Sequence, residues 1–104
     1  MGRLDGKSAL VTASAQGMGR GIALCLAEEG ADVMVSDLGT QEAGMKEVVA
    51  EIEALGRRAA ICTTDVTDRD AVKALVDRTV ETFGHLDIAV ANAGVSVIGP
   101  MLEA

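Results

Sequence analysis

The sequence has almost no aromatic residues: it contains one Phe, no Tyr and no Trp. Tyrosine acid/base catalysis is therefore excluded within these 104 residues. The single histidine, His85, excludes a metal site built from several histidines, and a triad with a histidine base would have to use it. We expect His85 to be a solvated turn residue. We therefore assign no catalytic residue and no metal ligand.

Basic residues are also few. Nine Lys and Arg stand against sixteen Asp and Glu, which gives a net charge of −7. Nucleic acids and anionic membranes need clustered Lys and Arg, so neither is an expected partner. The apolar runs are far shorter than the ~20 residues that cross a bilayer, and the first residues show no pattern of a secretory signal. We expect a cytoplasmic protein.

The two cysteines, Cys25 and Cys62, are far apart in the sequence. A redox pair or a metal site would need a closer spacing and more ligands. Both cysteines lie among apolar residues, so we expect two buried structural thiols.

Four short apolar runs alternate with three longer amphipathic segments. The runs are bounded by Gly and Asp, which is typical of strands buried on both faces of a parallel sheet. The amphipathic segments carry apolar residues at helical spacing. This alternation predicts one α/β domain over residues 1–104, with right-handed crossovers and helices on both faces of the sheet. The expected strands are 8–13, 32–36, 59–64 and 86–91, and the expected helices are 18–29, 40–55 and 67–83.

The first turn from strand to helix, residues 12–19, is rich in small residues. Glycines in such a turn let backbone N–H groups approach a pyrophosphate, and the helix N-terminus adds partial positive charge. The other interpretation is a glycine-assisted turn without a ligand. Gly19 and Gly21 weaken the helix that follows, so we expect a packing or binding reason for both. Arg20 either approaches a phosphate or is an exposed helix side chain.

Polar residues end the next three strands. Asp37 could accept hydrogen bonds from both ribose hydroxyls of an adenosine, or could be a turn residue. Asp65 could reach the adenine amino group, or could cap the helix that starts near Thr67, where residues 67–70 resemble a capping box. The stretch 92–94 could bridge neighbouring strands and leave room for a ribose. All these positions fall at the carboxyl ends of strands, where open α/β sheets bind ligands.

In this order and spacing, Thr12-x4-Gly17-x-Gly19, Asp37, Asp65-Val66 and Asn92-Ala93-Gly94 resemble the short-chain dehydrogenase/reductases. The resemblance covers essentially the whole chain. It implies a Rossmann-type doubly wound parallel sheet, βαβαβαβ with strand order 3-2-1-4, that binds NAD or NADP. The cofactor-binding residues that it implies, together with their neighbours, are Ala13, Ser14, Gln16, Gly17, Met18, Gly19, Asp37, Leu38, Asp65, Val66, Asn92, Ala93 and Gly94.

The chain departs from the family pattern in three ways. Ala13 and Ala91 stand where the family usually has Gly and Asn. The family's catalytic Ser and Tyr-x-x-x-Lys, and its substrate loop, lie beyond the point where this sequence ends. We therefore expect the cofactor-binding half of an alcohol/ketone oxidoreductase, truncated after the fourth strand. Substrate contact and homo-oligomer formation would belong to a full-length parent.

The expected cofactor is NAD rather than NADP. The Asp37 carboxylate would repel a 2′-phosphate, and Gln16 and Leu38 offer no compensating positive charge. Two other functions stay open. A non-catalytic dinucleotide-binding module would agree with the absence of Tyr. A methyltransferase also has a glycine-rich first turn, but the spacing before Gly17 and the Asn-Ala-Gly turn disfavour it.

Overall fold

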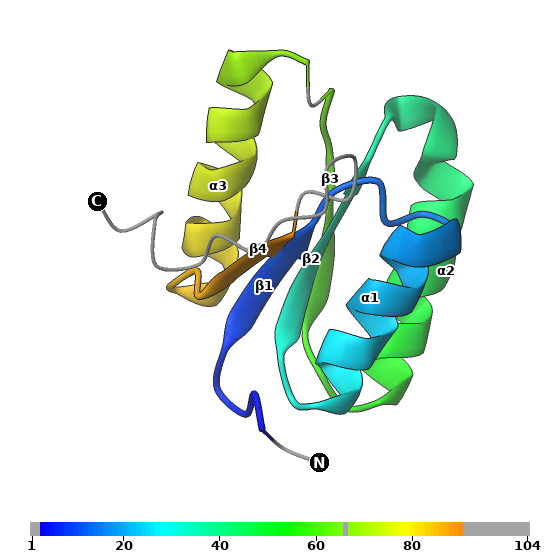
Figure 1. Ribbon diagram of the computed structural model, residues 1–104, viewed down its shortest axis with the longest axis vertical. Helices are drawn as coiled ribbons and strands as arrows, with labels where there is room; N and C mark the ends of the chain where they lie inside the picture. The colour runs from blue at the N-terminus through cyan, green and yellow to red at the C-terminus, as the bar shows by residue number, and fades with distance from the viewer. Residues whose placement is uncertain (1–2, 66, 91–104) are drawn as a thin grey trace.

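The computed structural model describes residues 3–65 and 67–90 and shows a three-layer α/β arrangement (Figure 1). Its sheet has four parallel strands in the order β3-β2-β1-β4. The strands are β1 (Ser8–Val11), β2 (Asp32–Asp37), β3 (Ala59–Thr63) and β4 (Ile88–Val90). Helices α1 (Gly17–Glu28) and α2 (Glu42–Ala54) cover one face, and α3 (Arg69–Phe83) covers the other. The fold and strand order predicted from the sequence are confirmed.

The central strands are buried on both faces, as their continuous apolar runs predict. All four residues of β1 are buried. In β2, Val33 and Val35 pack with α1 and α2, whereas Met34 belongs to the core beneath α3. This alternation follows from the period of two along a strand. The two cores hold the sheet rigid and fix where its carboxyl edge lies.

Two helices start two residues later than the sequence predicts. Helix α2 begins at Glu42, because residues Gly39–Gln41 form a separate 3-10 turn after β2. Helix α3 is capped by Asp68, whose carboxylate accepts hydrogen bonds from the N–H groups of Asp70 and Ala71 at 2.9 and 3.3 Å. The predicted capping box starting at Thr67 is therefore wrong. Thr67 is held instead by Asp65, in the turn that precedes the cap.

The prediction of two buried cysteines is also wrong. Cys25 is exposed on α1, and Cys62 is only half-buried on β3. On α1 the buried positions are Gly19, Ala23 and Ala27, which recur every four residues. Cys25 falls between them on the outer face of the helix.

The amino end of the sheet is held by paired polar groups. The Asp32 carboxylate, at the start of β2, accepts a hydrogen bond from Arg58 Nε at 2.9 Å and contacts Nη2 at 2.8 Å. Asp87 accepts from the N–H of Ser8 at 2.9 Å and contacts the His85 ring at 3.0 Å. The Ser8 hydroxyl donates to the carbonyl oxygen of His85. Ser8, His85 and Asp87 therefore connect β1 to the start of β4 and do not have the bonding of a catalytic triad.

Among the described residues, no helix is both long and apolar enough to cross a membrane.

Candidate functional site

A cavity of about 240 Å³ lies at the carboxyl edge of the sheet. It brings together four residues predicted from the sequence: Ala13 after β1, Asp37 and Leu38 at the end of β2, and Asp65 after β3. These three strand ends are far apart in the chain and meet because parallel strands end at one edge. The cavity is lined by Ala13, Asp37, Leu38, Thr64, Asp65 and Thr67.

The turn between β1 and α1 is anchored to the sheet through Ser14. This side chain is fully buried. Its hydroxyl donates to the carbonyl oxygen of Val11 at 2.8 Å and accepts from the N–H of Ser36 at 2.9 Å. The Ser14 hydroxyl is thus occupied within the protein. The Ser14 N–H also donates to the carbonyl oxygen of Ser36 at 3.0 Å, so this predicted site residue supports the turn from within the protein.

The backbone of the turn is tight at Ala13. Ala13 has φ of +51° and is the one non-glycine residue with positive φ in the described part of the chain. An L-residue there is strained by roughly 1–2 kcal/mol relative to an ordinary conformation. A methyl group added at Gly19 would lie 2.8 Å from the carbonyl carbon of Ala13. Gly19 therefore has the packing reason that we expected, whereas the same position on Gly21 faces open space.

The N-terminus of α1 suits an anion. No side chain caps the helix at Gln16, and its first turn contains no acidic residue. The partial positive charge of the helix end is therefore not offset locally. Met18, in the first turn, leaves 67% of its surface exposed. Arg20 contacts Glu47 at 4.0 Å and is ion-paired with Glu51, both on α2. It is therefore a half-buried bridge between two helices and not an exposed side chain, while its approach to a phosphate stays a prediction.

The Asp37 carboxylate contacts the turn itself. Its Oδ2 accepts from the N–H of Ala15 at 3.1 Å, and its Oδ1 accepts from the N–H of Leu38 at 2.8 Å. Both donors are uncharged backbone groups. The side chain is half-buried and lines the cavity, beside the exposed Leu38. An ionised carboxylate has about four acceptor positions, so about two stay open toward a ligand.

Asp65 organises the far wall of the cavity. Its Oδ1 accepts hydrogen bonds from the hydroxyl and the N–H of Thr67 at 2.6 and 2.9 Å. These bonds, the hydroxyl first, hold the pKa of the exposed Asp65 carboxyl below its ordinary value of 3.8. Asp65 shapes the approach to α3 without capping it, since Asp68 is the cap. Asp65 itself lines the cavity.

Four predicted site residues, Val66, Asn92, Ala93 and Gly94, lie outside the described residues. Conversely, three residues were missed. Thr64 and Thr67 line the cavity, and the run of Thr and Asp at the end of β3 and after it was a signal for both. Ala15 donates its backbone N–H to Asp37. This hydrogen bond could not be predicted from the residue type at position 15, because nearly every residue has a backbone N–H.

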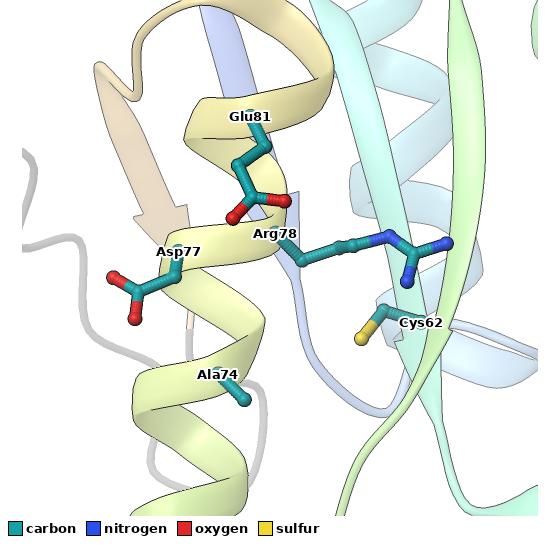
Figure 2. A pocket seen from close by; sticks show the side chains of 5 residues that line it. All are labelled: Cys62, Ala74, Asp77, Arg78 and Glu81. Carbon is teal, nitrogen blue, oxygen red and sulfur yellow. The ribbon is translucent and has the colours of Figure 1, made fainter.

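A larger cavity, of about 350 Å³, lies between β3 and α3 and is lined by Cys62, Ala74, Asp77, Arg78 and Glu81 (Figure 2). Arg78 extends from α3 toward β3, whereas Asp77 points away from Cys62. Asp77 is already paired with Lys73, 3.2 Å away. Size would favour this cavity, but its charged groups do not converge. The smaller cavity has the better chemistry, because two carboxylates, those of Asp37 and Asp65, line it at the ends of neighbouring strands.

Comparison with known proteins identifies the fold family. The family model for short chain dehydrogenase matches residues 7–104. This chain belongs to the short chain dehydrogenase family. Among its relatives, (-)-trans-carveol dehydrogenase of Rhodococcus erythropolis is 41% identical over an alignment of 109 residues. The alignment covers 94% of this chain and 39% of that protein. Versicolorin reductase stcU of Emericella nidulans is 47% identical over 97 residues, 93% of this chain and 36% of that protein.

Solved structures of short chain dehydrogenases superpose closely on this chain. Carveol dehydrogenase from Mycobacterium avium, in complex with NAD, gives a TM-score of 0.82 at 38% identity over 93% of this chain and 39% of its own. A short chain dehydrogenase from Burkholderia cenocepacia, in complex with NADP, gives 0.80 at 50% identity over 85% of this chain and 36% of its own. The chain thus spans under two-fifths of these relatives, and they differ in cofactor.

The residues fit one end of such a dinucleotide. The cavity of about 240 Å³ is below the ~300–1,000 Å³ that hold a whole drug-sized ligand. It offers two carboxylates as acceptors, and the uncapped start of α1 lies after the same turn. Hydroxyl and amino groups of an adenosine would suit the carboxylates, and a pyrophosphate would suit the helix end. This chain carries the cofactor-binding region of a dehydrogenase/reductase.

Proposed function

We propose that this chain binds NAD and forms the cofactor-binding part of an alcohol/ketone oxidoreductase of the short chain dehydrogenase family. The observation that carries the proposal is the Asp37 carboxylate in the cavity, which is held by two backbone N–H groups and has no cationic partner in the described part of the chain. A carboxylate so placed accepts hydrogen bonds from ribose hydroxyls and repels a phosphate.

The preference for NAD over NADP follows from charge. A 2′-phosphate would meet Asp37 in a half-buried position, where repulsion is weakly screened. The two neighbouring positions that could supply a compensating cation hold Gln16 and Leu38. Arg20 is occupied by two glutamates on α2. We expect NAD to be favoured by about 1–3 kcal/mol, or roughly 10- to 100-fold in affinity.

The chemistry itself would come from the cofactor, whose nicotinamide carries the hydride. The residues of this chain bind and orient it: Asp37 and Asp65 hold the adenosine, and the turn before α1 holds the pyrophosphate. The sequence contains no Tyr. We propose that the proton-transfer groups and the substrate contacts come from another segment of the protein. We also propose that the protein acts in the cytoplasm.

The test is a binding titration of NADH and NADPH on the wild type and on Asp37→Ser. The wild type should favour NADH, and the serine should narrow the preference, because it removes the negative charge. Asp32→Ser is the matched control, since it removes an aspartate from the opposite end of the same strand. Equal affinities in the wild type, or a preference that Asp37→Ser leaves unchanged, would show that Asp37 is only a turn residue.

The alternative function is a non-catalytic dinucleotide-binding module. It would bind NADH in the same cavity, so titration does not separate the two. The intact mass of the natural protein does: a mass near 10.6 kDa favours the module, and a mass more than twice as large favours the enzyme.

A further inference from the structure

We propose that Asp37 is a positioning residue for the glycine-rich turn, in addition to being a ligand acceptor. The inference deepens the proposed function and rests on it for the identity of the ligand. It starts from the hydrogen bond between the Ala15 N–H and Asp37 Oδ2, which are 3.1 Å apart. This bond connects the middle of the turn to the last residue of β2.

Ala15 depends on Asp37 because it has no access to water. Its residue surface is 1% exposed, and Asp37 Oδ2 is the acceptor that the structure gives its N–H. A buried N–H that loses its acceptor is strongly unfavourable. Removing the carboxylate therefore forces the turn either to bury an unpaired donor or to open toward solvent.

The other contacts of the turn hold different points. Ser14 is bonded on both sides to the sheet: its N–H donates to Ser36 O at 3.0 Å and its hydroxyl to Val11 O at 2.8 Å. Gly19 packs under the carbonyl of Ala13. Between Ser14 and the first turn of α1, the Asp37 side chain holds the backbone through its hydrogen bond to the Ala15 N–H. It fixes the path by which the chain enters the helix end that would receive the pyrophosphate.

One carboxylate can serve both roles at once. Oδ2 faces Ala15 and Oδ1 faces the N–H of Leu38 at 2.8 Å, which leaves further acceptor positions on both oxygens. A ligand hydroxyl can therefore bind without displacing the turn. The charge of Asp37 would select the ligand, whereas its geometry would hold the turn for any dinucleotide, with or without a 2′-phosphate.

Two substitutions separate charge from geometry. Asp37→Asn removes the charge but keeps one carbonyl oxygen that can accept from Ala15. Asp37→Ser removes the charge and is too short to reach. We expect amide hydrogen exchange at Ala15, measured without ligand, to stay near the wild-type rate in Asp37→Asn and to rise roughly 10-fold or more in Asp37→Ser. Exchange at Leu10 in β1 reports global unfolding and corrects for it.

Ligand affinities give a second readout. Both variants lose the repulsion of the 2′-phosphate, so a role for charge alone predicts equal NADPH affinities. If Asp37 also positions the turn, Asp37→Asn should bind NADPH roughly 10-fold more tightly than Asp37→Ser. Unchanged Ala15 exchange in Asp37→Ser, or equal NADPH affinities in the two variants, would overturn the proposal.

Should Asp37→Ser not fold, the wild type still tests it. The Ala15 amide of the wild type should be protected from hydrogen exchange, and exchange at the rate of an unfolded chain would refute the hydrogen bond. Failure of the proposed function looks different: the wild type would then bind neither NADH nor NADPH, whereas the exchange result on the free protein would stand.

Discussion

Strand β2 begins and ends with an aspartate, and the two have opposite surroundings. Asp32, at the amino end, is paired with the Arg58 guanidinium at 2.8–2.9 Å and also accepts from the Arg58 N–H at 2.9 Å. Asp37, at the carboxyl end, accepts hydrogen bonds from the N–H groups of Ala15 and Leu38 and has no ion-pair partner among the described residues. The same residue type in the same strand thus has its charge neutralised at one end and left in place at the other.

The other edge residues differ in a second way. At the amino end Asp87 is bonded to the N–H of Ser8 and contacts the His85 ring, whereas at the carboxyl end Asp65 is bonded to the hydroxyl and N–H of Thr67 and lines the cavity. Neutral donors orient a carboxylate without cancelling its charge, so it can still bind a ligand. We infer that the amino end of the sheet serves stability and that the carboxyl end serves binding.

The largest effect on stability and NADH affinity is expected from a substitution at Gly19. Gly19→Ala would press a methyl group against the carbonyl of Ala13, and overpacking of this kind costs about 1–3 kcal/mol of stability. Because the turn must shift to relieve it, NADH affinity should fall at least about 10-fold. Urea denaturation and a binding titration measure the two effects.

Gly21→Ala is the matched control on the same helix. Position 21 faces open space, so alanine should raise stability by roughly 0.5–1 kcal/mol through helix propensity and leave NADH affinity unchanged. A loss of binding in Gly21→Ala would show that α1, and not the contact at Ala13, sets the site.

Asp32→Ser tests the amino end. The Asp32 side chain is 16% exposed and is held by Arg58 through both its side chain and its backbone. Its loss should lower the free energy of unfolding by about 1–2 kcal/mol, because a partly buried hydrogen-bonded ion pair is broken. NADH affinity measured on the folded protein should not change. A drop in NADH affinity without a drop in the free energy of unfolding would contradict the view that the amino end of the sheet serves stability and the carboxyl end serves binding.

The smallest effect is expected at Thr67. The hydroxyl and N–H of Thr67 stabilise the ionised form of Asp65, which lowers its pKa. Thr67→Val removes the hydroxyl bond, so the pKa of Asp65 should rise toward its ordinary value. The stabilisation of the fold by this bond is present above the ordinary pKa and is lost as the pH falls through the lowered one. The carboxyl carbon shift of Asp65, followed by NMR in both proteins, checks the direction.

The sequence predicted the fold well because the fold depends on patterns. Continuous apolar runs mark the buried strands, and glycines such as Gly84, with φ of +91°, end the helices. The same pattern placed Asp37 and Asp65 at one edge. The sequence did not reveal which of several neighbouring polar side chains would cap the start of α3. Asp68 caps α3 and Asp65 holds Thr67, but a cap at Thr67 would fit the same run of Thr and Asp.

Backbone contacts were equally hidden. The bond from Ala15 to Asp37 uses an N–H that every residue but proline has. The left-handed conformation of Ala13 is one that alanine rarely adopts, so the sequence alone could not show that the turn keeps it. The exposure of Cys25 depends on its angular position on α1, which apolar neighbours in the sequence do not show.

The most direct test of the division between the two ends is a map of amide chemical shifts on titration with NADH. The account predicts that the amides of Gln16–Gly19, Leu38 and Asp65, at the carboxyl edge, shift with one common saturation curve, while those of Asp32, Arg58 and Asp87 do not move. Saturable shifts at the amino end, or none at Leu38 and Asp65, would contradict it.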